Sequence, residues 1–84
     1  MRKIYKYPVR SGASAAIPAG GTVIHVGLDP GKNSCVWVEV DPAAPKTDTV
    51  FVLGTGWDVP DSLTHVGSWV EGPYVWHAYV KRGG

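Results

Sequence analysis

The four consecutive residues Gly54-Thr55-Gly56-Trp57 combine groups that could hold a phosphorylated aromatic molecule. The glycines allow backbone N–H groups to point at an anion, Thr55 adds a hydroxyl, and Trp57 offers an indole on which a base can stack. The same residues also suit an ordinary connection in which Trp57 closes the end of a sheet. The residue types leave both interpretations open.

The end and the start of the chain supply the rest of this candidate site. The segment from Trp76 to Tyr79 is expected to form one wall, and a basic residue from the start of the chain would neutralise a phosphate. Lysines on an edge strand also serve to prevent aggregation, so a phosphate role is one of two interpretations. The candidate ligand-binding residues are Gly54, Thr55, Gly56, Trp57, His77, Tyr79, Lys3 and Arg10.

Residues that could carry catalysis or bind a metal are few. Cys35 lies inside a predicted strand, where a lone thiol is usually a small core residue. The histidines, His25, His65 and His77, lack the close spacing of a metal site such as two histidines on one helical turn. Asp58 and Asp61 flank Val59-Pro60, which is typical of a turn. We therefore expect no enzyme activity, no metal and no cofactor, with a nucleotide hydrolase as a minor alternative.

Length and charge limit the classes of protein that remain. The chain has 84 residues and a net charge of +1, so one domain over residues 1–84 is expected and duplex nucleic acid is an unfavoured partner. A single cysteine excludes an internal disulfide framework. No apolar run is long enough for a membrane span or a signal peptide, so we expect no membrane partner and a cytoplasmic protein.

The elements that must position these residues are strands. Helical periodicity is absent, and short runs rich in Val, Ile, Tyr and Trp alternate with clusters of Gly, Pro, Asp and Asn. This pattern predicts an all-β fold, a small antiparallel β-sandwich or partly open barrel of about six to seven short strands. Strands are expected near residues 2–8, 13–17, 21–29, 35–41, 48–54, 64–70 and 74–81.

Two of the predicted hairpins look like copies of one pattern, because each contains His-Val-Gly followed by Val-Trp. We expect Gly27 to lie opposite Trp37, and Gly67 opposite Trp76, so that each ring covers the gap that a glycine leaves in a strand. A tight turn at Glu71-Gly72 would set the second register. The last strand has no polar face, which indicates an apolar surface that assembly would cover.

Several segments resemble a family of short, functionally uncharacterised proteins of bacteriophages and prophages. They are the opening Met1-Arg2-Lys3-Ile4-Tyr5-Lys6-Tyr7-Pro8, the Gly54-Thr55-Gly56 loop and the final Val75-Trp76-His77, and the similarity extends over nearly the whole chain. Members tend to carry a histidine after this loop, where this chain has Trp57. The resemblance implies an accessory protein made in the cytoplasm of the bacterial host.

The expected function follows from the candidate site and from this setting. Several unrelated phage proteins of similar length are homo-oligomeric sponges that trap the nucleotide signals of bacterial immunity, and the analogy is one of size and setting. We expect a homo-oligomer that sequesters a small nucleotide-like ligand without catalysis. The alternative is an interaction module that inhibits or bridges a host or phage protein through an aromatic surface or a strand edge.

Overall fold

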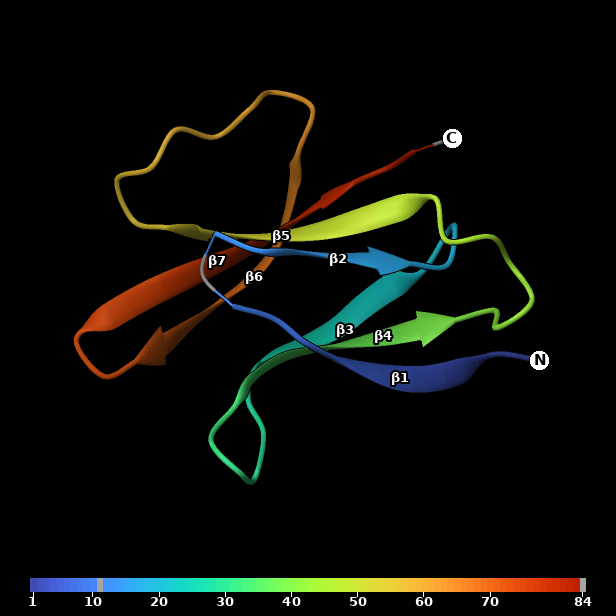
Figure 1. The fold of residues 1–84 in the computed structure, drawn as a ribbon, viewed down its shortest axis with the longest axis horizontal. Helices are drawn as coiled ribbons and strands as arrows, with labels where there is room; N and C mark the ends of the chain where they lie inside the picture. Colours follow the sequence, from blue (N-terminus) through green and yellow to red (C-terminus); the bar gives the residue numbers. More distant parts are fainter. Residues whose placement is uncertain (11, 84) are drawn as a thin grey trace.

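The computed structural model of the protein describes residues 1–10 and 12–83, which form two antiparallel sheets packed face to face (Figure 1). One sheet has three strands in the order β1-β4-β3, and the other has four in the order β2-β5-β7-β6. The strands are β1 (Lys3–Pro8), β2 (Ser14–Ile17), β3 (Thr22–Leu28), β4 (Ser34–Val40), β5 (Asp48–Gly54), β6 (Thr64–Glu71) and β7 (Tyr74–Lys81). The prediction of an all-β antiparallel fold is confirmed, and the sheets do not close into a barrel.

The core lies between the sheets and consists mainly of valines. Because side chains alternate across a strand, every second residue of β4 and β5 points inward and is buried. β-Branched side chains suit this pleated, enclosed surface. The buried apolar cluster contains Val9, Ile17, Val36, Val38, Val40, Val50, Val52, Trp69, Ala78 and Val80.

The register of the β3–β4 hairpin differs from the prediction. His25, not Gly27, lies opposite Trp37, and Gly27 lies opposite Cys35. The five-residue loop is shorter than expected because its two ends bond to each other: the Asp29 N–H donates to the Asn33 carbonyl, and the Asn33 N–H donates to Asp29 Oδ1. A bulge between Val23 and His25 then shifts the register once more.

The register of the β6–β7 hairpin is also not the predicted one. Gly72, with φ of 59°, is the first turn residue, so Glu71 pairs with Tyr74 and the turn lies one residue later than expected. Trp76 consequently lies between Trp69 on β6 and Gly54 on β5, and Gly67 pairs with Ala78. The predicted pairing of a tryptophan with a strand glycine exists, but the glycine is Gly54.

A buried carboxylate joins the end of the chain to the turn before β3. Asp48 accepts hydrogen bonds from the backbone N–H of Gly83 at 3.0 Å, from Arg82 at 2.8 Å and from the Gly20 N–H at 2.9 Å. The same Arg82 donates to the Gly21 carbonyl at 2.9 Å. These bonds, the Gly83 N–H foremost, hold the pKa of Asp48 below its usual value. The carboxylate therefore stays ionised although it is buried.

Candidate ligand site

A groove of about 720 Å³ lies where the ends of both hairpins meet the segment that follows β1. Figure 1 shows these three parts of the chain on the same side of the molecule. Cationic, anionic and aromatic side chains share the lining. The lining residues are Lys6, Pro8, Val9, Arg10, Asp29, Lys32, Asn33, Ser34, Glu71, Tyr74 and Trp76.

The β3–β4 loop forms one side of the groove and is held in shape by Asp29. Besides its bonds to Asn33, Asp29 accepts the backbone N–H of Lys32 on its carbonyl at 2.8 Å and forms an ion pair with Lys6 at 3.0 Å. The Asn33 backbone N–H, followed by Lys6, lowers the pKa of Asp29 to about 2. Lys32 adopts φ of 64°, a conformation that few residues other than glycine take. The loop therefore presents Lys32 from a preorganised turn.

The charges of the groove do not cancel completely. Lys6 is paired with Asp29, and Glu71 accepts the Ser34 hydroxyl at 2.7 Å. Among the described residues, no carboxylate lies within 4 Å of the charged group of Arg10 or Lys32. These two cations are thus available to an anion in the groove.

Two aromatic rings from the β6–β7 hairpin form the opposite side. Tyr74 and Trp76 are stacked, with ring centroids 5.7 Å apart and planes inclined by 26°. They also line a second hollow of about 530 Å³, together with Gly54, Thr55 and Trp57. The two hollows are therefore neighbours that share this aromatic pair.

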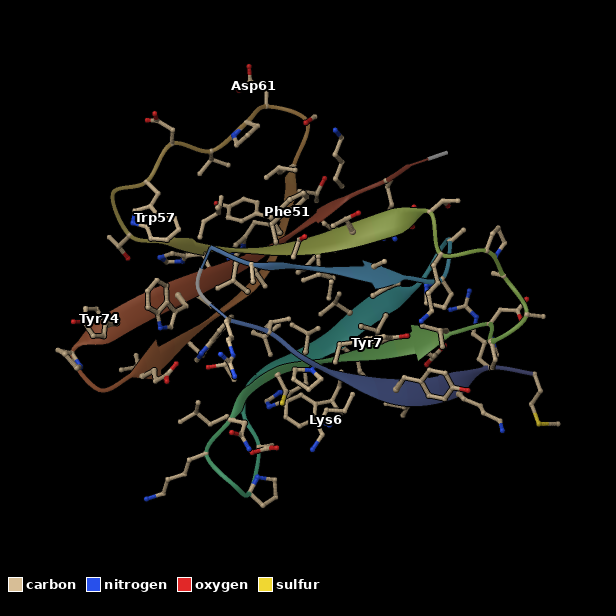
Figure 2. The ribbon with its side chains drawn as sticks, viewed as in Figure 1. Lys6, Tyr7, Phe51, Trp57, Asp61 and Tyr74 are labelled. Atoms are coloured by element: carbon tan, nitrogen blue, oxygen red, sulfur yellow. The ribbon has the colours of Figure 1, made fainter. Side chains whose placement is uncertain are left out.

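Trp57 lies against the end of the four-stranded sheet, and Figure 2 shows it at the same side of the molecule as Tyr74. A Cβ added at Gly54 would lie 2.8 Å from the indole, and one added at Gly12 would lie 3.7 Å from it. The indole also meets Trp76 edge-on, with centroids 6.0 Å apart. It remains 47% exposed, so Trp57 covers the sheet end and still offers surface to a ligand.

His77 and Tyr79 lie on the other face of the same sheet. Ala78 and Val80 are buried in the core, so their neighbours on β7 point outward by alternation. Thr55 reaches this outer face, since its hydroxyl lies 2.8 Å from His77 Nε2 and donates to the Val75 carbonyl at 3.2 Å. Thr55 thus contributes to the second hollow and to the outer face.

The predicted site residues are accordingly divided among several places. Gly54, Thr55 and Trp57 line the second hollow and Arg10 lines the first, so these residues are brought to one end of the molecule. Gly56 is the turn residue of the loop, with φ of 91°. Lys3 pairs with Val40 at the far end of β1 and lines neither hollow.

The site residues selected from the sequence leave out most of the groove lining, including Lys6, Lys32 and Tyr74. Lys6 and Lys32 come together through the pairing of β1 with β4, a contact between segments that no local pattern reveals. A signal was available for Lys32, because it belongs to the turn segment Asp29-Pro30-Gly31-Lys32-Asn33, whose residue types favour a tight, exposed loop. Tyr74 follows the turn at Gly72, so its position in the groove depends on the register between β6 and β7.

The fold and the two hollows define a small all-β protein with a candidate ligand site at the hairpin ends of a sandwich. Residues 1–84 match the family model described as Domain of unknown function (DUF7352), and the chain belongs to that family. The resemblance to a family of uncharacterised proteins is therefore confirmed. No curated protein and no solved structure matches the chain significantly.

Two features are absent from the part of the chain that the structure describes. Across residues 1–10 and 12–83, His, Cys, Asp and Glu side chains do not gather in groups of three or more that could hold a metal ion. The same part of the chain contains no helix long and apolar enough to cross a membrane.

Proposed function

We propose that this protein binds a small anionic ligand of the nucleotide class and does not convert it. The observation that carries the proposal is that the stacked pair of Tyr74 and Trp76 lines the same groove as Arg10 and Lys32. Aromatic planes next to cations are the combination that recognises a base joined to a phosphate. The proposal combines the predicted ligand class with a groove that the fold assembles.

The two hollows suit the two halves of such a ligand. The second hollow, with Trp57 and the aromatic pair, offers mainly apolar surface for a base, while the groove offers Arg10 and Lys32 for phosphate oxygens. Glu71 stands at the same groove and can accept a hydrogen bond from a ribose hydroxyl or an exocyclic amine. Both hollows are of ordinary size for small-molecule sites.

Binding without conversion is supported by the way the groove uses its polar groups. The Ser34 hydroxyl donates to Glu71 and accepts the Trp69 indole N–H at 3.3 Å. These bonds connect β4 to β6 and keep the hairpin ends together. These hydrogen bonds give Ser34 a structural role, which explains the presence of a serine in the groove without a catalytic function.

The proposed function includes a biological setting, the cytoplasm of a bacterial host. The sequence resemblance to phage and prophage proteins supports a role in the cytoplasm of a bacterial host, and the small core of an 84-residue chain supports a homo-oligomer. In this setting, the protein sequesters a nucleotide immune signal such as a cyclic dinucleotide or a cyclic ADP-ribose isomer.

The proposal is tested by calorimetric titration of those nucleotides into the purified protein and into Tyr74→Ala and Arg10→Ala. We expect Tyr74→Ala to bind about five- to a hundred-fold more weakly, the usual effect of losing a stacking ring. Tyr74→Phe keeps the ring and should bind like the wild type. Arg2→Ala is the charge control for Arg10, because Arg2 pairs with Glu39 outside the groove.

Recovery of the ligand separates binding from turnover. Nucleotides carried through purification from a bacterial lysate should be released unchanged on heating. A changed product would make the protein an enzyme, and equal binding by wild type, Tyr74→Ala and Arg10→Ala would remove the groove from the proposal.

An interaction module remains the second candidate, and one observation favours it. Val70 and Val75 pair across the β6–β7 hairpin and are 65% and 40% exposed. An exposed aliphatic pair next to an edge strand is a common place for a protein partner. If none of the titrated nucleotides binds, and the protein forms a stable complex with a protein partner through this hairpin, this alternative is favoured.

A further inference from the structure

Two imidazole rings converge on one hydroxyl on the outer face of the four-stranded sheet, away from the groove. His65 Nε2 lies 2.9 Å from Ser68 Oγ, and His77 Nδ1 lies 2.7 Å from the same oxygen. The centroids of the two rings are 6.3 Å apart. Nitrogen atoms of two histidines thus approach one point from different strands.

A β-bulge produces this arrangement. Ser68 pairs with His77, and His65 pairs with Tyr79, but the register shifts between His65 and Gly67. Without the shift, residues three positions apart on β6 would point to opposite faces. The bulge turns His65 to the face of Ser68 and His77, and bulges often re-aim a side chain in this way.

The hydrogen bonds determine which nitrogen of His77 carries a proton. Thr55 has one hydroxyl proton and donates it to the Val75 carbonyl, so it must accept the Nε2–H of His77. In the neutral ring, His77 Nδ1 then holds a lone pair and points at Ser68. A histidine that binds a metal commonly donates its other N–H to a fixed acceptor, which sets the ring orientation and the tautomer.

We propose that His65 and His77 bind a divalent transition-metal ion of the Zn²⁺, Ni²⁺ or Cu²⁺ class. His65 Nε2 and His77 Nδ1 are the protein ligands. When the ion binds, the proton that His65 Nε2 now donates to Ser68 moves to Nδ1 of the same ring, and the Ser68 hydroxyl rotates away. The ion takes the position of that hydroxyl, and water completes the coordination. Neutral imidazole is a preferred ligand of these ions. The spacing of the histidines along the chain had indicated no metal site, because the bulge and the pairing of β6 with β7 are not visible in that spacing.

The surroundings support the two ligands. Tyr79 packs edge-on against His65 with ring centroids 5.3 Å apart, and Leu53 on β5 lies opposite His77. Each ring therefore has an apolar or aromatic neighbour on the same face of the sheet. With two imidazoles and no third strong ligand among the described residues, the affinity should be that of a modest, exchangeable site.

The test is a calorimetric titration of Zn²⁺ into the purified wild-type protein, with Ni²⁺ and Cu²⁺ as comparisons. We expect one ion per chain. Binding should be lost in His65→Ala and in His77→Ala but retained in His25→Ala, which changes the histidine that packs against Trp37 of the other sheet. Imidazole resonances of His65 and His77, and not of His25, should shift when Zn²⁺ is added.

Two further variants distinguish a metal site from a hydrogen-bonded cluster that serves only packing. Ser68→Ala removes the shared hydroxyl but keeps both imidazoles, so it should still bind Zn²⁺. Thr55→Val should weaken binding about ten-fold, the lower end of the effect of removing a partner that orients a ligand. No saturable uptake by the wild type, or uptake unchanged by His65→Ala and His77→Ala in folded protein, would overturn the proposal. The groove would be unaffected by that result, since neither histidine lines it.

Discussion

Gly67 on β6 lies directly against Val26 on β3, at the place where the two sheets touch. A Cβ added at Gly67 would be 2.5 Å from Cγ2 of Val26, closer than real side-chain carbons approach one another. The two strands belong to different sheets, and they are in contact. Gly67 is therefore needed for the close approach of the sheets and not for the packing of a tryptophan ring.

Replacing Gly67 with alanine should destabilise the protein by about 1 to 3 kcal/mol, the usual cost of forcing extra volume into a packed interior. Urea unfolding measures the change. The double variant Gly67→Ala/Val26→Ala is the control, because the smaller side chain at position 26 makes room for the new methyl group. A double variant whose loss equals the sum of the two single losses would show that these residues do not meet.

Trp69 should contribute more to stability than any exposed tryptophan of the chain. It is 7% exposed, belongs to the core cluster and donates its indole N–H to Ser34. Trp69→Ala should cost about 3 to 5 kcal/mol, as truncation of a buried large aromatic usually does. Trp69→Phe keeps most of the ring and should cost less. Thermal unfolding of both variants gives the comparison, and equal losses would contradict it.

Acid should weaken the fold through Asp48. Its pKa is lower in the folded protein than in the unfolded chain, so the stability that it contributes is present above the unfolded value of about 4. That contribution is lost as the pH falls through the folded value. Urea unfolding of wild type and Asp48→Asn, at neutral pH and at successively lower pH, should show a smaller acid loss in the variant. The same acid dependence in both proteins would assign the effect to other carboxylates.

Trp57 and Lys3 both belong to the predicted site but lie at opposite ends of the molecule. Their replacement should therefore change the affinity for a nucleotide to different extents. Trp57 lines the second hollow, and Trp57→Ala should weaken nucleotide binding by about 1 to 3 kcal/mol. Lys3 lies at the far end of β1, and Lys3→Ala should leave the affinity unchanged. Calorimetry on both variants, after circular dichroism confirms their fold, decides between this arrangement and a site that includes Lys3.

We expect the protein to form a homo-oligomer in solution. Light scattering at low micromolar concentration should find a species larger than the 9.0 kDa chain. Val70 is 65% exposed at the β6–β7 hairpin, so Val70→Asp should shift the population toward monomer. Thr22→Asp, a polar exchange on β3 of the other sheet, is the control. A wild type that is monomeric at every concentration would exclude the homo-oligomer.

The sequence by itself determined the class of fold and the position of its strands. Alternation of Val with other residues over 36–40 and 48–52 requires a buried sheet face, and the turn residues around Pro30 and Gly72 require chain reversals. These are local properties, because each depends on neighbours a few positions away. They were sufficient to place the seven strands.

Only the tertiary structure decided which residues face one another. The turn at Gly72 lies one residue later than expected, and that single step exchanged Gly67 for Trp69 as the β6 partner of Trp76, while Gly54 on β5 lies on its other side. The bulge after His65 likewise set two histidines around Ser68. Register depends on turn geometry and on the fit of distant side chains, and the groove depends on two sheets that meet. Neither is contained in the order of residues along a single strand.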